Sequence, residues 1–176
     1  MKALRWLAVA LAVGACTDRA PISAPESAPR LAPPAPQGSL IGGLLGATGL
    51  LRCSDLPYAS ATQTIGSAGG TIRVGPHTLT VPPGALAAPV AITGQIVTGR
   101  GVNEVRFSPD GLRFARSAAL TMSYSNCNLL GQLAPKRIAY VSSGLDILSY
   151  LLSIDNLFTK KVTGRVEHFS DYAVAW

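Results

Sequence analysis

Four neighbouring residues near the C-terminus, Glu167, His168, Ser170 and Asp171, have the side-chain types of a catalytic triad. A histidine that takes the proton of a serine hydroxyl makes that oxygen a nucleophile, and a carboxylate orients the histidine. On a regular strand, residues two apart have Cβ atoms ~7 Å from each other, which is beyond direct hydrogen-bond reach. Triads usually combine residues that are distant in sequence. The pattern therefore favours His168 and Ser170 as strand-end hydrogen-bonding groups.

Residue types that bind metals or phosphates are sparse. The two histidines, His77 and His168, stand near no cluster of acidic residues or cysteines, so no metal site is expected. His77 opens an alternating run and is expected at the surface or at a sheet edge. The glycines of residues 42–49 lack the Lys-Ser/Thr pair of a phosphate-binding loop. No cofactor is expected.

The strands that would position these residues are short and separated by turn signals. Residues 71–74 and 77–81 flank a Gly-Pro turn, and Pro82-Pro83-Gly84 ends the second strand because proline cannot donate to a sheet ladder. Further strands are expected at residues 90–97, 104–108, 119–125, 137–142, 147–152, 160–167 and 172–176. This spacing predicts an all-β fold, a single antiparallel β-sandwich.

Two local patterns in the sequence are compatible with more than one backbone structure. Leu145, Leu148 and Leu152 recur at helical spacing, but the Asp155-Asn156 turn signal and the β-rich residues after it favour a hairpin. Strict alternation would place Phe169 on the same face as two acidic residues. A bulge or bend near His168 is therefore expected to turn the Phe169 ring into the core.

The chain begins with an expected signal peptide, residues 1–15. Its apolar run is too short to span a bilayer, which needs ~20 residues. It ends in Val13-Gly14-Ala15-Cys16, which resembles the lipobox of bacterial lipoproteins. The resemblance implies that Cys16 carries diacylglyceryl and fatty-acyl groups such as palmitate, and that the protein resides in the bacterial cell envelope. Thr17 indicates the outer membrane. The alternative is an ordinary secretory signal.

Residues 16–52 are expected to form the lipidated, disordered Pro- and Gly-rich tether, and residues 53–176 the sandwich domain. The last part of the tether, residues 39–51, is apolar but interrupted by glycines and is expected to lie loosely against the domain or the lipid. With Cys16 lipidated, Cys53 and Cys127 form an even pair in an oxidising compartment, which predicts one disulfide.

Two separated motifs resemble the ZU-five domain family. They are Gly69-Gly70 followed by Pro-Pro-Gly-Ala-Leu at residues 82–86, and His168-Phe169-Ser170 with Tyr172. The resemblance covers residues 65–176 and implies a β-sandwich that acts in interaction and scaffolding. In some relatives the His-Phe-Ser site cuts its own backbone, which implies Ser170 attacking the Phe169 carbonyl with His168 as base. Cleavage here would release only residues 170–176, so the structural interpretation is favoured.

The charge pattern excludes one class of partner. The net charge is +6, and the basic residues are scattered with no nucleic-acid-binding motif, so no nucleic acid partner is expected. The expected function is a lipid-anchored envelope protein, not an enzyme, that displays a module for an envelope protein or polymer. A self-cleaving domain cut between Phe169 and Ser170 is the alternative. A secreted hydrolase is the third possibility.

Overall fold

The structure is a computed structural model that describes residues 49–129 and 134–176. The predicted signal peptide, the lipidation site at Cys16 and nearly all of the predicted tether lie outside the described residues. The described residues form eleven β-strands and no helix. In chain order the strands are β1 (Ser60–Ile65), β2 (Gly70–Val74), β3 (His77–Val81), β4 (Val90–Val97), β5 (Glu104–Ser108), β6 (Arg113–Ser123), β7 (Arg137–Val141), β8 (Ile147–Tyr150), β9 (Ser153–Asn156), β10 (Lys161–His168) and β11 (Asp171–Ala175).

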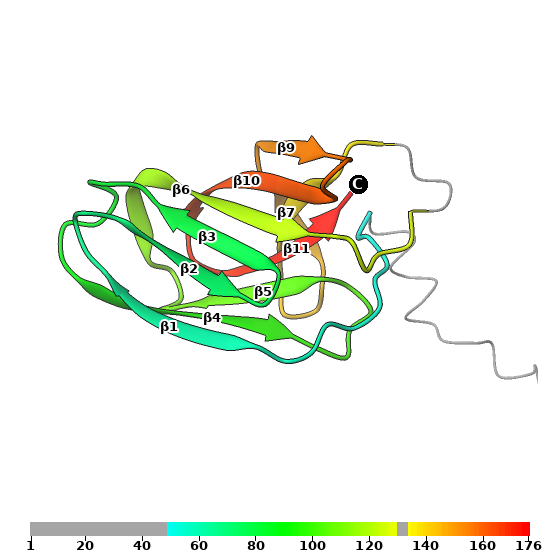
Figure 1. Cartoon of the computed structure of the whole chain (residues 1–176), viewed down its shortest axis with the longest axis horizontal. Helices are drawn as coiled ribbons and strands as arrows, with labels where there is room; N and C mark the ends of the chain where they lie inside the picture. The colour runs from blue at the N-terminus through cyan, green and yellow to red at the C-terminus, as the bar shows by residue number, and fades with distance from the viewer. Residues whose placement is uncertain (1–48, 130–133) are drawn as a thin grey trace, which may run out of the picture. The chain divides into compact units, whose positions relative to one another are not determined.

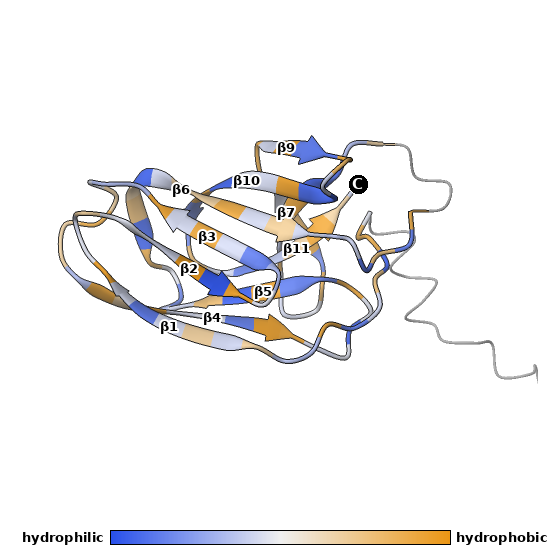
Figure 2. Cartoon of the chain, viewed as in Figure 1, coloured by the Kyte–Doolittle hydropathy of each residue, from blue (hydrophilic) through white to orange (hydrophobic). Residues whose placement is uncertain are grey.

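The strands form two antiparallel sheets packed face to face (Figure 1). The six-stranded sheet has the order β1-β4-β5-β11-β7-β8, and the five-stranded sheet has the order β2-β3-β6-β10-β9. Hydrophobic and hydrophilic bands alternate along strands such as β2 and β4, which is the pattern of strands with one buried face (Figure 2). The predicted all-β sandwich is confirmed.

The main core lies between the sheets. It contains aliphatic residues from both layers together with four fully buried aromatic residues, Phe107, Tyr124, Phe169 and Tyr172. Gly94 of β4 shows how closely the layers pack. A Cβ at this position would lie 2.5 Å from Val74 Cγ2 and 2.8 Å from Phe107 Cε1. Only glycine leaves room for both side chains.

The domain includes residues before the boundary predicted at Cys53. Leu50 and Leu51 are fully buried, and the Leu51 amide donates to the Val174 carbonyl at 2.9 Å. Leu50 forms a bridge with Ala175 and joins a small apolar cluster with Val102 and Leu145. These leucines belong to the packed domain and do not lie loosely against it, because pairing with the last strand gives their backbone and side chains partners.

Several strands differ from the predicted set. β1 was not predicted, because its sequence, SATQTI, has few apolar residues and shows no alternation. β6 begins six residues earlier than predicted. The strand predicted at residues 147–152 ends earlier, as β8, and pairs with β7 in one sheet. The next strand, β9, was not predicted and pairs with β10 in the other sheet. The predicted hairpin is present as β9–β10, but Asp155 and Asn156 end β9 and the turn follows at residues 157–160; the described residues here contain no helix.

Candidate functional site

The His168-Phe169-Ser170 segment is the connection between the two sheets. It joins the end of β10 in the five-stranded sheet to the start of β11 in the six-stranded sheet. The pairing of β10 with β6 shifts register between Val166 and His168. This irregularity turns Phe169 inward, where its ring stacks on Phe107 and meets Phe114 edge-on. The predicted bulge or bend near His168 is confirmed.

Three backbone hydrogen bonds hold this connection in place. The Phe169 amide donates to the Leu112 carbonyl at 2.8 Å, and the Phe169 carbonyl accepts from the Gly111 amide at 3.1 Å. The Ser170 carbonyl accepts from the Phe107 amide at 3.2 Å. In the peptide group between Phe169 and Ser170, the carbonyl oxygen is thus held by the Gly111 amide.

Tyr172 of β11 binds the connection through its side chain. Its hydroxyl donates to the His168 carbonyl oxygen four residues earlier. The ring is fully buried, and burial raises the pKa of the Tyr172 hydroxyl above its ordinary range. A buried tyrosine whose hydroxyl binds an upstream carbonyl where the chain changes sheets is a known way to fix such a corner in β-sandwiches.

His168 and Ser170 open onto different pockets. His168 lines a pocket of about 320 Å³, and Ser170 lines one of about 360 Å³ that also contains Arg106 and Asp171. Tyr140 lines both pockets and contacts the His168 ring edge-on, with ring centroids 5.2 Å apart. Among the described residues, no hydrogen bond joins the His168 ring to the Ser170 hydroxyl. The geometry places the two groups on the same connection without bringing them into contact.

The imidazole ring of His168 makes a polar contact with the peptide group between Phe169 and Ser170. Its Nδ1 lies 3.4 Å from the Phe169 carbonyl oxygen. When this nitrogen carries a proton it can donate to that oxygen, which already accepts from the Gly111 amide. Two donors on one carbonyl oxygen stabilise negative charge there. The site therefore resembles an oxyanion hole more than a pair of base and nucleophile.

An ion-pair network lies next to Ser170. Arg106 binds Asp171 in a bidentate arrangement, with nitrogen–oxygen distances of 2.6 and 2.7 Å. The Glu104 side chain is completely buried beside Arg106, and Arg100 lies 3.2 Å from its carboxylate. Burial raises the pKa of Glu104, and the charge of Arg100 opposes that shift. Because Arg106 and Asp171 pair β5 with β11, the network fixes the first residue of the last strand.

His77 is buried, and its predicted position at the surface or a sheet edge is wrong. Strand alternation places it on the same face as Leu79 and Val81, which point into the core. Its Nδ1 accepts a hydrogen bond from the Ser123 amide at 3.2 Å, and its buried Nε2 has no hydrogen-bond partner among the residues that the structure describes. Burial lowers the pKa of His77 to about 4. The prediction followed the polar type of the His77 side chain, whereas its position in the strand decides its burial.

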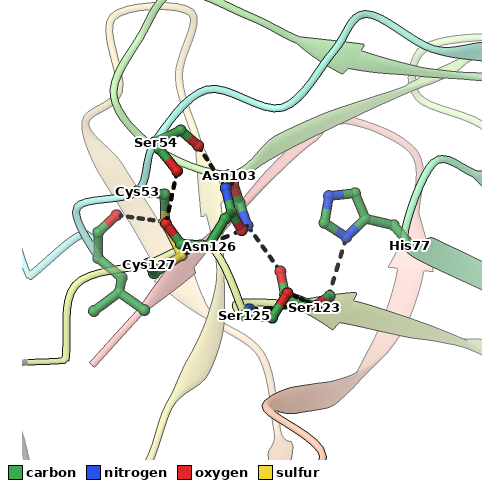
Figure 3. The surroundings of a disulfide bond; sticks show 9 residues. Cys53, Ser54, His77, Asn103, Ser123, Ser125, Asn126 and Cys127 are labelled. Atoms are coloured by element: carbon green, nitrogen blue, oxygen red, sulfur yellow. Dashed lines mark hydrogen bonds between the residues drawn. A yellow bond between two sulfur atoms is a disulfide. The ribbon is translucent and has the colours of Figure 1, made fainter.

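The predicted disulfide between Cys53 and Cys127 is present (Figure 3). Beside it, the side-chain amides of Asn103 and Asn126 donate to each other's oxygens at 2.7 and 2.9 Å. Asn103 also donates to the Ser123 carbonyl at 2.8 Å. This amide pair connects the disulfide to the residue that binds His77. Neither asparagine was singled out from the sequence, because an isolated Asn carries no motif.

Residues 49–129 and 134–176 show neither a metal-binding cluster nor a membrane-spanning helix. In these ranges no group of three or more histidine, cysteine or acidic side chains is placed to hold a metal ion. The same ranges contain no helix long and apolar enough to cross a membrane.

Comparison with known proteins leaves the family open. No family model matches the chain. A search of curated proteins also finds no match. The resemblance to the ZU-five family therefore remains a prediction.

Proposed function

We propose that this chain is a lipid-anchored protein of the bacterial cell envelope whose β-sandwich is an interaction or structural module of ZU-five type. The observation that carries the proposal is the disulfide between Cys53 and Cys127, which are 74 residues apart in the sequence. Disulfides form and persist in exported proteins and are rare in reducing compartments. This supports the export that the N-terminal sequence predicts. The signal peptide directs the chain out of the cell, and the lipid on Cys16 retains it at the membrane.

The surface of the sandwich supports an interaction role. Six large apolar side chains are exposed along residues 147–158, and we call them the apolar edge: Leu148, Tyr150, Leu152, Ile154, Leu157 and Phe158. Single exposed apolar residues are ordinary in soluble proteins, whereas six within twelve residues of the chain support a binding surface. The module displays this surface at the membrane.

Cys16→Ala tests the anchor. In bacteria fed a labelled palmitate analogue, the unsubstituted chain incorporates the label and the Cys16→Ala chain does not, because the acylated atom is gone. The Cys16→Ala precursor also keeps its signal peptide. A Cys53→Ala, Cys127→Ala double variant is the matched control and keeps the label. Label on the Cys16→Ala chain would contradict the proposal.

Self-cleavage is the second candidate, and the two donors at the Phe169 carbonyl oxygen favour it. The Ser170 hydroxyl would attack the Phe169 carbonyl carbon, the peptide C–N bond would break, and the hydroxyl proton would pass to the new Ser170 amine. Water would then hydrolyse the ester. Because β11 pairs on both sides with β5 and β7, the released peptide would stay bound until denaturation.

Intact mass under denaturing conditions separates the two candidates. Self-cleavage predicts loss of residues 170–176 from the main chain and no loss in a Ser170→Ala variant. The structural role of the connection predicts one unbroken chain for both proteins. If the unsubstituted chain is unbroken, self-cleavage is refuted and the proposed interaction or structural module stands.

A further inference from the structure

The apolar edge is built from the edge strands of both sheets. β8 ends the six-stranded sheet and β9 ends the five-stranded sheet. Exposure rises toward the β9–β10 turn, from 53% at Leu148 to 79% at Ile154 and 100% at Phe158. Leu157, which is 58% exposed, and the fully exposed Phe158 form an apolar tip at this turn.

Positive charges accompany these apolar groups on one face of the hairpin. Asn156 is opposite Lys161 and Ile154 is opposite Thr163, so the outward side chains of β9 lie beside those of β10. The outward residues of β10 include Lys161 and Arg165, and Lys160 lies in the turn; all three are exposed. The face combines apolar groups with positive charge.

The acidic groups of the hairpin do not cancel this charge. Asp155 turns inward, where it accepts a hydrogen bond of 2.6 Å from the Tyr124 hydroxyl and another from the Lys136 amide. Glu167 is exposed on the same face near the far end of β10, two residues beyond Arg165 and six beyond Lys161, so the two lysines next to the tip are the charges most distant from it. The ion pairs of Arg100 and Arg106 with Glu104 and Asp171 lie on and beside β5, in the other sheet.

The tip lies at the end of the domain where the tether enters. The Lys160 carbonyl, next to the tip, accepts from the Tyr124 amide at 2.9 Å, and the disulfide joins nearby Cys127 to Cys53. Gly49, the first described residue, lies against Tyr150 of the apolar edge. Figure 1 shows the head of β9, the first described residues and the C-terminus at the same end of the sandwich.

We propose that the β9–β10 hairpin docks onto the anionic phospholipid surface of the membrane that holds the chain's own anchor. The inference rests on the proposed function for the presence of that anchor. Leu157 and Phe158 insert at the boundary between headgroups and acyl chains, while Leu152 and Ile154 lie along it. Lys160, Lys161 and Arg165 face the phosphates. The tether keeps the membrane surface at a high local concentration near the hairpin, so weak binding of the hairpin to the lipid is sufficient for docking.

A second copy of the chain fits this surface less well. In a two-fold symmetric dimer each hairpin would face its own counterpart. Lys160, Lys161 and Arg165 of one copy would then approach the same residues of the other, and like charges in contact are destabilising. An anionic lipid surface satisfies the apolar and the charged groups together.

The test places a tryptophan at the tip of the full-length mature chain. A Phe158→Trp protein is reconstituted into vesicles of equimolar phosphatidylethanolamine and phosphatidylglycerol that contain brominated acyl chains, which quench nearby tryptophan. The matched control is Ala88→Trp, an exposed position in the loop before β4 at the opposite end of the sandwich. Fluorescence of the unsubstituted chain corrects for Trp176.

We expect Phe158→Trp to be quenched at least twofold more than Ala88→Trp. Adding Lys160→Gln and Lys161→Gln should weaken vesicle association of the domain about fivefold for each lysine, since each basic group near an anionic surface contributes that factor. Arg116→Gln, at the far end of β6, should have no effect.

Equal quenching of Phe158→Trp and Ala88→Trp would overturn the proposal. So would quenching of Phe158→Trp that is as strong in phosphatidylcholine vesicles without anionic lipid. A third contrary result is a shift of the Phe158→Trp emission that needs no lipid and depends on protein concentration. The last would identify a second copy as the occupant. The mass of the N-terminal peptide reports the anchor separately. If Cys16 carries no lipid, the proposed anchor fails, and the Phe158→Trp chain is then added to excess vesicles. Quenching of its tryptophan under these conditions still supports the docking surface.

Discussion

Acid should destabilise this domain through His77. The imidazole is buried, its Nδ1 accepts a hydrogen bond from the Ser123 amide, and burial lowers its pKa to about 4. In the unfolded chain the pKa returns to its ordinary value of 6.5. Between these values the unfolded state binds a proton that the folded state does not. The free energy of unfolding therefore falls as the pH decreases below 6.5, and the loss is complete below about pH 4.

The size of the effect follows from the two pKa values. A difference of one pH unit corresponds to ~1.4 kcal/mol, so His77 accounts for a loss of about 3 kcal/mol across this window. Glu104 acts with the opposite sign, because its pKa is raised by burial and the folded state takes up its proton first. A single pH profile would mix the two contributions, so a variant is needed to isolate His77.

His77→Asn provides that comparison. The Asn Oδ1 can accept the hydrogen bond from the Ser123 amide, and the side chain does not titrate in this range. Urea denaturation of both proteins at pH 7 and at pH 4 gives the four free energies of unfolding. We expect the unsubstituted chain to lose about 3 kcal/mol more than the variant between the two pH values. Identical losses in the two proteins would refute the assignment of the acid sensitivity to His77.

Three further substitutions test the packing of the sandwich, each by urea denaturation at pH 7. Replacing Cys53 and Cys127 with serine should lower the free energy of unfolding by ~4 kcal/mol, because the closed loop is long, and no change on replacement would show that the disulfide does not constrain the unfolded chain. Tyr172→Phe should cost about 1–3 kcal/mol, since the buried His168 carbonyl loses its donor; a neutral result would mean that the hydroxyl does not fix the corner. Gly94→Ala should cost about 1–3 kcal/mol because the new Cβ would overlap Val74 and Phe107. Stability equal to that of the unsubstituted chain would contradict the close packing at that point.

The strands with clear alternation could be predicted from the sequence. β3, β4 and β5 have the predicted bounds, because each is enclosed by turn residues and buries every second side chain. β1 could not be predicted, since it is a polar edge strand that depends on pairing with β4. The burial of Leu50 and Leu51 depends in the same way on a partner at the other end of the chain, the strand β11.

The site was predicted in part. The irregularity near His168 followed from the conflict between alternation and the apolar ring of Phe169, which is a local property of the sequence. His77 was misplaced because a polar residue type was given more weight than strand position, and tertiary packing decided in favour of position. The exposure of the apolar edge could not be foreseen, because Leu152 and Ile154 have the composition of a core strand and only the sheet order shows that β9 is an outer strand.

The intact mass of the chain purified from membranes tests the central claim most directly. A lipid-anchored, unbroken module predicts one species that begins at Cys16, carries diacylglyceryl and acyl groups there, contains one disulfide and ends at Trp176. A species without lipid, or one that begins at a different residue, would contradict the anchored envelope protein proposed for this chain.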